Sequence, residues 1–433
     1  MFPNLAYGGG KMNDFVISGV KMFKPSGEVV TADIHVSGDK ISEITPSTQT
    51  SKFLATPGLV NAHTHASMTL LRSYSDDKSL MDWLQKDIWP IEAKMKRKDI
   101  YWGAALAAVE MIKSGTTAFA DMYGPCMEEV AKVVDESGLR GSLCRGLIGI
   151  FDGDEKLADN VELYKNCHGA ADGRVTIMFG PHAIYTCPPD YLKKVAAEAQ
   201  KLGAEIHIHM NETKTEIEDS IKTYGKRPFE VVNETGIFDT GTLAAHCVHL
   251  SDAEIEIIKA KKIRIAHNPG SNMKLASGIA PVKKLLDEKI TVALGTDGAS
   301  SNNNLDMLEE IRLAALLAKV DTLDPLAVPA TQAIQMATEF GAEALGLKNV
   351  GKLEVGMKAD IVLWDMSGVE WQPNYNPASL LVYSANSSAV DTVIVDGKIL
   401  MQNRELKTLD EEKICAEFKA CANRLTGKSA LVF

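Results

Sequence analysis

The sequence predicts an α/β protein, a (β/α)8 TIM barrel with a small β-sandwich domain built from both chain ends. In the middle of the chain, apolar strands alternate with amphipathic helices, the pattern of βα units around a parallel sheet. These strands repeatedly end in a polar side chain, and barrel active sites are assembled at that end of the strands. Short β-rich stretches flank the alternating region on both sides.

The composition is that of a globular protein that acts on a small molecule. The chain has 433 residues, 45% of them hydrophobic, which is enough for a large core. Its formal charge of -11 comes from 57 acidic and 46 basic residues without a Lys/Arg cluster, which disfavours nucleic acid or an anionic membrane as partner. A homo-oligomer remains compatible with this composition.

The cellular setting follows from cysteine usage and from the absence of long apolar runs. Seven scattered cysteines with no CxxC pair favour the reduced cytoplasm over a disulfide framework or a thiolate zinc site. No signal peptide or membrane span is visible in the sequence.

The two chain ends are predicted to form the small β-sandwich. Residues 1–57 contain short strands between Gly and Pro turns, and the first eleven of them, residues 1–11, are predicted to be a disordered extension. Residues 351–433 return to the same β texture and finish in a helix over residues 410–426. Each end alone has too few strands for a core, so we expect the two to meet.

The barrel is predicted over residues 58–350. Its strands are expected at LVNAHTH (59–65), TTAFADM (116–122), RGSLCRGL (140–147), RVTIMFGPH (174–182), AEIHIHM (204–210), TLAAHCV (242–248), IRIAHN (263–268) and ITVALGTD (290–297). The side chains that can take part in chemistry at their ends are His63, His65, Asp121, Arg145, His182, His209, His246, His267, Asn268 and Asp297. Ordinary buried strands do not stop repeatedly at such residues, so we expect an active site at this rim.

Three histidines and one aspartate form the predicted metal site. His63 and His65 lie two apart in one strand and project from the same face, so both can bind one cation. A catalytic zinc site needs further ligands, which we assign to His209 at the end of the fifth strand and Asp297 at the end of the eighth. His207 also points inward but lies deeper, and we interpret it as a buried structural residue.

Two further residues are candidates for moving protons. Glu212 follows the fifth strand three residues after His209, close enough to reach a metal-bound water without being a ligand itself. His246 ends the sixth strand and, with Asp297, could orient the attacking water. Beside a metal, these roles are favoured over helix capping or core packing.

The motifs PGLVNAHTHASMTLLRSYSDD, IHMNET, AAHCVHL, HNPGSNMKLASGIAP and LGTDGASSNN resemble the amidohydrolase superfamily over nearly the whole chain. Within it, LMDWLQKDIWPIEAKM and HNPGSNMKLASG are similar to the 5-methylthioadenosine/S-adenosylhomocysteine deaminases. The resemblance implies hydrolysis of the 6-amino group of an adenine nucleoside to the inosine analogue and ammonia, with adenosine and 5'-deoxyadenosine as further candidate substrates. It implies the same four metal ligands, with Glu212 and Asp297 also contacting the substrate.

The same resemblance implies a set of residues that bind the nucleoside. Glu92 would accept hydrogen bonds from the ribose hydroxyls, and Arg145 and His182 would contact the nucleoside. Trp83 would lie near the ribose or the thioether. Lys156 stands where the family commonly has an arginine for the homocysteine carboxylate; a lysine offers a point charge instead of a fork, which leaves the preferred nucleoside open.

The cofactor is predicted to be one divalent metal per chain, because the chain has one complete ligand set and no bridging lysine at the fourth strand. Zinc is the expected ion, and Fe²⁺ and Mn²⁺ also accept three imidazoles and a carboxylate. The alternatives within the superfamily are guanine or cytosine deaminases and triazine chlorohydrolases, which share the metal ligands. An alternative of another class is an inactive structural relative, which should lack some of the ligands that this chain has.

Overall fold

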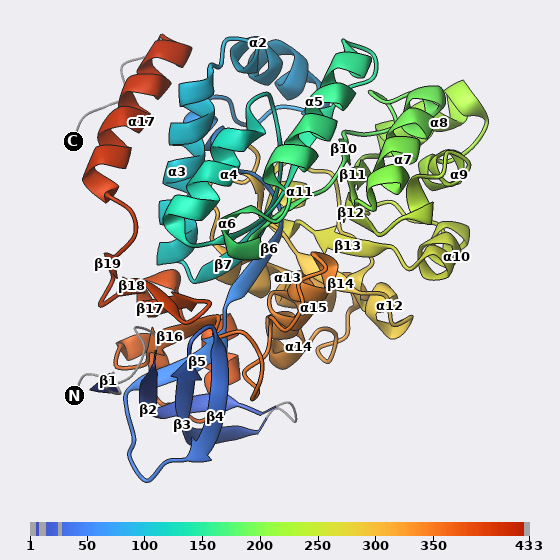
Figure 1. Ribbon diagram of the computed structural model, residues 1–433. Coiled ribbons are helices and arrows are strands. Elements are labelled where there is room, and N and C mark those ends of the chain that lie inside the picture. Colours follow the sequence, from blue (N-terminus) through green and yellow to red (C-terminus); the bar gives the residue numbers. More distant parts are fainter. Residues whose placement is uncertain (1–5, 8–13, 25–27, 428–433) are drawn as a thin grey trace.

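The structure is a computed structural model that describes residues 6–7, 14–24 and 28–427 (Figure 1). Of the predicted extension, residues 1–5 and 8–11 lie outside the described residues. Ala6–Tyr7 form the short strand β1, which pairs antiparallel with the following strand β2 (Phe15–Phe23). The fold is α/β, as predicted.

Parallel strands follow one another around a ring in the centre of the molecule. In chain order they are β6 (Leu59–His65), β7 (Thr116–Tyr123), β8 (Arg140–Leu147), β9 (Val175–Ile177), β10 (Gly180–Pro181), β11 (Ile206–Met210), β12 (Thr242–His246), β13 (Arg264–His267), β14 (Val292–Leu294) and β15 (Asp297–Gly298). A parallel bridge between Phe179 and Ile206 joins the first sheet of this ring to the second. The ring closes where β15 pairs with Thr64 and His65 of β6, which gives the barrel-like order that the sequence predicts.

Two of the predicted strands are each broken into two short pieces. The eighth is interrupted at Gly295, where a Cβ atom would lie 2.8 Å from the Cβ of His63. The absence of a side chain therefore lets this strand approach β6 directly beneath the predicted metal site. The fourth is interrupted before Gly180, where a Cβ would lie 2.7 Å from the carbonyl oxygen of Arg145.

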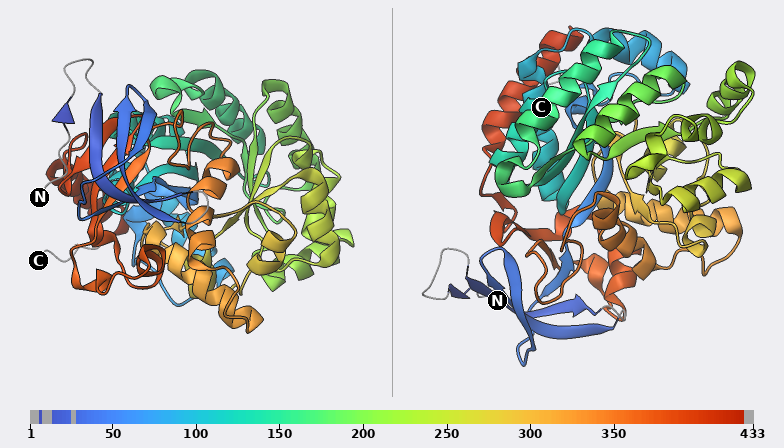
Figure 2. Two further views of the ribbon diagram at one scale, coloured as in Figure 1. Left: turned by 90° about the horizontal axis from the view of Figure 1, so that it is seen from below. Right: turned by 45° about the vertical axis from the view of Figure 1, so that its right-hand side comes forward.

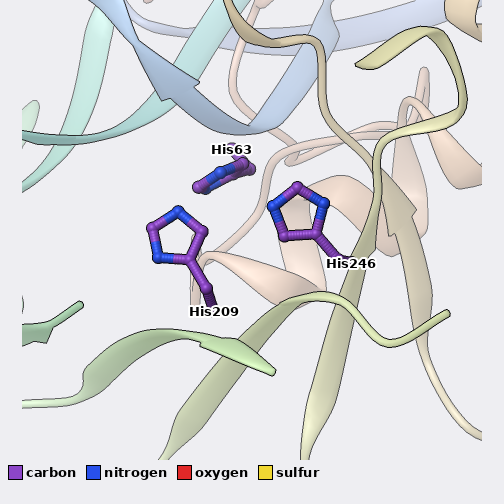
Figure 3. A group of neighbouring side chains, drawn as sticks. All are labelled: His63, His209 and His246. Atoms are coloured by element: carbon purple, nitrogen blue, oxygen red, sulfur yellow. The ribbon is translucent and has the colours of Figure 1, made fainter. Parts of the chain in front are cut away.

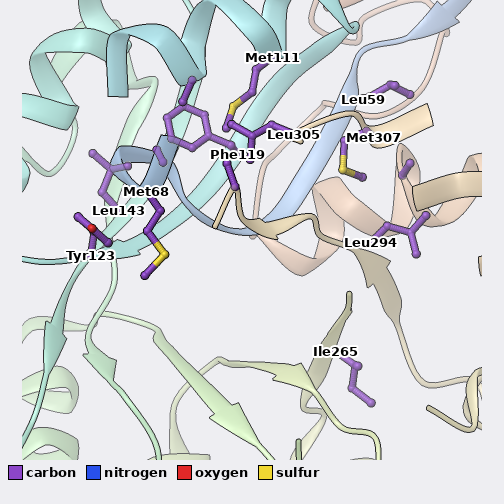
Figure 4. Packing of buried hydrophobic residues seen from close by; sticks show 14 of the residues in the cluster. Leu59, Met68, Met111, Phe119, Tyr123, Leu143, Ile265, Leu294, Leu305 and Met307 are labelled. Atoms are coloured by element: carbon purple, nitrogen blue, oxygen red, sulfur yellow. The ribbon is translucent and has the colours of Figure 1, made fainter. Parts of the chain in front are cut away.

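Helices cover the outside of the ring, as the view from below shows (Figure 2, left). The principal ones are α3 (Arg97–Lys113), α4 (Met127–Ser137), α5 (Gly153–Cys167), α7 (Pro189–Leu202), α8 (Lys214–Tyr224), α10 (Asp252–Lys261) and α13 (Met307–Thr322). Phe119 of β7 and Met111 of α3 pack in the buried layer between strands and helices, as do Leu305 and Met307 (Figure 4). None of the helices among the described residues is both long and apolar enough to cross a bilayer.

Strands from both chain ends form one nine-stranded sheet beside the ring (Figure 1). Its N-terminal strands are β1, β2, β3 (Val29–Ser37), β4 (Lys40–Pro46) and β5 (Phe53–Pro57), and its C-terminal strands are β16 (Ile361–Asp365), β17 (Val390–Val395), β18 (Lys398–Gln402) and β19 (Glu405–Leu406). The two sets meet where β16 pairs antiparallel with β5. The arrangement of these strands as two layers of a sandwich stays a prediction.

A buried ion-pair cluster connects this sheet to the amino-terminal end of the barrel strands. Arg140, the first residue of β8, donates from Nε to Oδ2 of Asp360 at 2.7 Å and from Nη2 to Oδ1 at 2.9 Å. Its Nη2 also contacts Asp396, which follows β17. The terminal helix α17 (Glu411–Thr426) lies along α3 and is attached there by the pair Arg424–Asp99 (Figure 2, right).

Candidate active site

A cavity of about 910 Å³ opens at the carboxyl-terminal ends of the ring strands. It is the place where the strand ends predicted from the sequence converge. The predicted site residues that line it are His65, Trp83, Glu92, Arg145, His182, His209, Glu212, His246 and Asp297. His63 lies fully buried at its base, and Lys156 is absent from its lining.

The four predicted metal ligands present their atoms to one small volume. Nε2 of His63 lies 3.4 Å and Nε2 of His65 lies 3.1 Å from Oδ1 of Asp297. Nε2 of His209 lies 3.4 Å from Nε2 of His65. Ligands about 2.0–2.1 Å from one ion at tetrahedral angles are about 3.3 Å apart, so these three spacings are compatible with three edges of a zinc tetrahedron.

Hydrogen bonds at the far sides of two imidazoles determine where their lone pairs point. Nδ1–H of His65 donates to the carbonyl oxygen of Met122, and Nδ1–H of His209 donates to that of His182 at 2.8 Å. Nε2 of His65 therefore faces Oδ1 of Asp297, and Nε2 of His209 faces Nε2 of His65. Lone pairs and a carboxylate gathered in one place repel one another unless a cation lies between them.

His63 is held by the neighbouring histidine of strand β11. Nδ1 of His63 lies 2.9 Å from Nε2 of His207, and both rings are completely buried. Burial lowers the pKa of His63 to about 4, so its ring is neutral at pH 7. His207, predicted as a buried structural residue, therefore also orients the imidazole ring of His63 beside Asp297.

A second triplet of histidines extends the cluster. His63, His209 and His246 converge from β6, β11 and β12 (Figure 3), and one nitrogen of each lies within 4.8 Å of the others. His246 belongs to this group although the sequence analysis placed it outside the ligand set. Its Nδ1–H donates to Oδ1 of Asn272 at 2.8 Å, which leaves Nε2 as an acceptor toward the cavity.

Three residues at the strand ends of the site adopt a left-handed backbone conformation. The φ angles are 52° at Asn211, 72° at His246 and 64° at Asp297. Such values are uncommon for residues other than glycine and cost of order 1–3 kcal/mol each. The fold therefore stores backbone strain where it presents the predicted catalytic groups.

Glu212 lies at the edge of the histidine cluster. Its Oε1 accepts a hydrogen bond from the hydroxyl of Ser277 at 3.2 Å, and its Oε2 lies 3.8 Å from Nε2 of His246. Its backbone N–H donates to Oε2 of Glu216 at 2.7 Å, which fixes the chain at this turn. Burial raises the pKa of Glu212, which brings a carboxyl group closer to the range where it can both accept and donate a proton at neutral pH.

A second carboxylate that lines the cavity belongs to the half-buried Glu92. Glu92 ends the short helix α2 (Trp89–Glu92) and lines the cavity together with Tyr123, whose pKa is raised by burial and by the nearby Glu92 carboxylate. Among the described residues, Oε1 of Glu92 has no hydrogen-bond partner although it is buried. Burial raises the pKa of Glu92, and an unpaired buried oxygen at a cavity wall is an acceptor available to a ligand.

The rest of this wall is apolar. Trp83, at the end of α1 (Leu80–Trp83), directs its ring to the cavity while its Nε1–H donates to the carbonyl oxygen of Ser75 at 3.1 Å. The other apolar residues that line the cavity include Met68, Leu80, Leu84, Trp89, Met95, Ile100, Met122, Pro125, Ile148 and Leu275. This wall suits an apolar or thioether group.

Comparison with known proteins identifies the family to which this chain belongs. The model of the amidohydrolase family matches residues 54–400. The chain belongs to the amidohydrolase family. This family is metal-dependent, and the cluster of imidazoles and a carboxylate fits a divalent cation.

Individual relatives extend the match to almost the whole amidohydrolase chain. This chain is 52% identical over 417 residues to a protein of Pelotomaculum thermopropionicum named 5-methylthioadenosine/S-adenosylhomocysteine deaminase. The match covers 93% of this chain and 96% of that protein. The structure of an adenosine deaminase of Xanthomonas campestris, solved with bound zinc, matches with a TM-score of 0.89 and 33% sequence identity. The match covers 95% of this chain and 98% of that chain. The structure of the atrazine chlorohydrolase of Arthrobacter aurescens, complexed with zinc, matches with a TM-score of 0.87 and 25% sequence identity. The match covers 94% of this chain and 99% of that chain.

Two of the remaining predicted residues of this amidohydrolase lie in the cavity and one does not. Nη1 of Arg145 lies 3.4 Å from the carbonyl oxygen of Tyr123, and its Nε is buried without a hydrogen-bond partner in the described part of the chain. His182 donates from Nδ1 to Thr186 Oγ1 at 2.9 Å, and burial lowers its pKa to about 3, so the ring is neutral. The Lys156 ammonium instead donates to the carbonyl oxygen of Phe151.

Sequence reasoning missed several residues that hold the catalytic candidates in place. Tyr123 ends strand β7 one residue beyond the predicted strand, so its contact with Glu92 has no local signal. Ser271 and Ser277 lie in the quoted motif HNPGSNMKLASG, but the motif alone does not say which side chains they contact. Only the structure places them against Asp297 and Glu212.

Proposed function

We propose that this amidohydrolase is a deaminase that hydrolyses the 6-amino group of adenine nucleosides, chiefly 5-methylthioadenosine and S-adenosylhomocysteine, to the inosine analogue and ammonia. The observation that carries the proposal is a single cavity lined by histidines of the cluster, Glu212 and Glu92, whose Oε1 is buried and has no hydrogen-bond partner among the described residues. The name of the relative from Pelotomaculum thermopropionicum, at 52% identity, supports the same substrates.

The proposed ligands of one divalent metal, zinc in the first instance, are His63, His65, His209 and Asp297. The spacing of their ligand atoms, 3.1–3.4 Å, supports this set. A divalent metal bound there would lower the pKa of a coordinated water to about 7 and so would supply the nucleophile at neutral pH.

The proton transfers are assigned to groups of the protein. Glu212 takes the proton released by the water and delivers it to N1 of the adenine ring, because its buried carboxyl group has a raised pKa. His246, whose Nε2 is the free acceptor, and Asp297 hold the new hydroxyl group on C6. The proton of the new hydroxyl group is then transferred to the amino group, the C6–N bond breaks, ammonia leaves, and C6 becomes a carbonyl carbon.

The proposed nucleoside lies along the cavity between these groups and the apolar wall. Glu92 accepts hydrogen bonds from both ribose hydroxyls, which its unpaired oxygen supports. Arg145 and His182 contact the nucleoside, and Trp83 faces the ribose or the thioether. The contact predicted for Lys156 with a homocysteine carboxylate stays a prediction.

Deamination of a free base is the competing function, and triazine hydrolysis shares the metal ligands. The Glu92–Tyr123 pair favours nucleosides, since a base without ribose offers no vicinal diol to this carboxylate. Turnover should be followed by ultraviolet absorbance on adenosine, 5-methylthioadenosine, S-adenosylhomocysteine, 5'-deoxyadenosine and guanine. We expect conversion of the adenine nucleosides; turnover of guanine alone, or of none of them, would refute the proposal.

We also propose that the chain divides into the ranges 1–57, 58–350 and 351–433, with the barrel in the middle range and both outer ranges in one β-sandwich domain. The pairing of β5 with β16 supports this division. The enzyme is proposed to act in the cytoplasm on a small molecule.

A further inference from the structure

Two buried serines lie six residues apart on the segment that follows strand β13. Ser271 belongs to helix α11 (Pro269–Lys274) and is completely buried, and Ser277 follows that helix and is 6% exposed. The hydroxyl of Ser271 donates to Oδ2 of Asp297 at 2.7 Å. The hydroxyl of Ser277 donates to Oε1 of Glu212 at 3.2 Å. One segment therefore contacts two carboxylates that come from different parts of the barrel rim.

Each serine binds the carboxylate oxygen that faces away from the other site groups. Oδ1 of Asp297 is the atom that approaches His63 and His65, so Ser271 fixes the rotation of this carboxylate through its second oxygen. In Glu212, Ser277 binds Oε1 and leaves Oε2 beside His246. In both cases the serine binds one oxygen of the carboxylate, and the other oxygen faces histidines of the site.

The main chain holds Ser277 firmly in this position. Its N–H donates to the carbonyl oxygen of Asn272 at 2.8 Å, and its own carbonyl oxygen accepts a hydrogen bond from Nε2–H of His249 at 2.7 Å. The next residue, Gly278, has φ 127°, and a Cβ there would lie 3.0 Å from Val248. Ser277 is therefore fixed against the loop after β12 and cannot follow Glu212 if that side chain turns away.

We propose that Ser271 and Ser277 are positioning residues with separate tasks in this enzyme. Ser271 orients the Asp297 carboxylate for metal retention, whereas Ser277 orients the Glu212 carboxylate for proton transfer. The inference rests on the proposed function, in which Asp297 is a metal ligand and Glu212 carries protons. A purely structural role for the segment would couple the two effects, because both serines would then act through the stability of the same loop.

The test compares Ser271→Ala with Ser277→Ala in the full-length enzyme, by the zinc Kd from competition with a chelator and by kcat and KM with zinc at saturation. For Ser271→Ala we expect the zinc Kd to rise by at least about tenfold, as outer hydrogen-bond partners of metal ligands commonly contribute. For Ser277→Ala we expect an unchanged zinc Kd and KM and a fall in kcat of about tenfold, since a hydrogen bond to a charged group is lost. Ser277→Thr, which keeps the hydroxyl, should recover most of kcat.

Ser137→Ala is the matched control. Ser137 is a fully buried serine at the end of α4 whose hydroxyl donates to the carbonyl oxygen of Val134, and it is absent from the cavity lining. This variant should leave the zinc Kd, kcat and KM unchanged. The proposal is overturned if Ser271→Ala and Ser277→Ala change the zinc Kd and kcat together, or if neither variant changes either quantity.

The outcome for the proposed function is read separately. A wild-type enzyme that converts no adenine nucleoside would refute the proposed function. In that case the zinc Kd of Ser271→Ala still decides whether Ser271 supports metal retention. If the wild type is active, a normal kcat in Ser277→Ala would refute the inference alone.

Discussion

Two buried clusters of charged or polar groups lie at opposite ends of the barrel strands, and they differ in how their atoms are paired. At the amino-terminal end, the Arg140 guanidinium donates to both oxygens of Asp360, and the backbone N–H of Asp396 donates to Oδ1 of Asp360 at 2.9 Å. At the carboxyl-terminal end, imidazoles of His63 and His65 lie beside Oδ1 of Asp297, and His209 lies beside His65.

The difference shows how a functional cluster can be recognised. Donors and acceptors match in the Arg140 cluster, so it needs nothing further and connects the nine-stranded sheet to the barrel. The histidine cluster has an excess of acceptors, and positive φ angles at His246 and Asp297 show that the backbone is strained to present them. Matched pairing indicates a structural cluster, and unmatched acceptors beside a cavity indicate a ligand site.

The largest expected effect comes from removing a ligand of the cation. His63→Ala or Asp297→Ala should abolish both zinc retention and turnover, because each removes one of the four proposed ligand atoms and the protein contact that holds the ion in place. Metal analysis of the purified variants, with kcat on 5-methylthioadenosine, checks this. The wild type should contain close to one tightly bound metal per chain, and a value close to two would contradict the single site.

The second effect separates the proton carrier from the ligands. Glu212→Gln should keep its metal and its affinity for the nucleoside while kcat falls roughly a hundredfold to ten-thousandfold, since the amide cannot accept the proton. Metal content measures retention of the ion, and single-turnover rates measure catalysis independently of it. If the variant loses its metal instead, Glu212 is a ligand, and if kcat stays near normal, His246 becomes the next candidate.

The third effect tests the opposite end of the barrel. Arg140→Ala leaves the carboxylate of Asp360 buried without its partner, so the free energy of unfolding should fall by about 3–5 kcal/mol while zinc content and KM change little in the folded fraction. Urea denaturation of both proteins checks this. Lys113→Ala is the control, because the Lys113–Glu411 pair is partly exposed and such pairs contribute about 0–1 kcal/mol. Equal losses in the two variants would remove the distinction.

The smallest of these effects concerns the substrate wall. Glu92→Ala should lower kcat/KM on nucleosides about a hundredfold, or roughly 3 kcal/mol, because two charge-assisted hydrogen bonds to the ribose are lost. The melting temperature should change little, since Glu92 has an unpaired oxygen in the described structure. Steady-state kinetics on 5-methylthioadenosine provide the measurement, and unchanged kinetics would favour a free-base substrate.

Much of the fold and part of the candidate site could be predicted because their signals are local. The alternation of apolar strands and amphipathic helices predicts the α/β class, and His63 and His65 share a strand face by their spacing alone. His209, His246 and Asp297 were predicted because each ends an apolar strand. All of them lie at the cavity or its base, because parallel strands around a ring bring their carboxyl ends together.

Other features depend on residues that are far apart in the sequence, and only the tertiary structure decides them. Arg140 and Asp360 are separated by 220 positions, and Ser277 lies 65 positions from Glu212. Such contacts depend on how elements pack, which neither helix periodicity nor strand alternation encodes. Lys156 illustrates the limit, since only the structure shows that its ammonium donates to the carbonyl of Phe151, while the substrate contact that the resemblance implies stays a prediction. Local sequence determines which groups lie at the strand ends, and packing determines which second groups hold them in position.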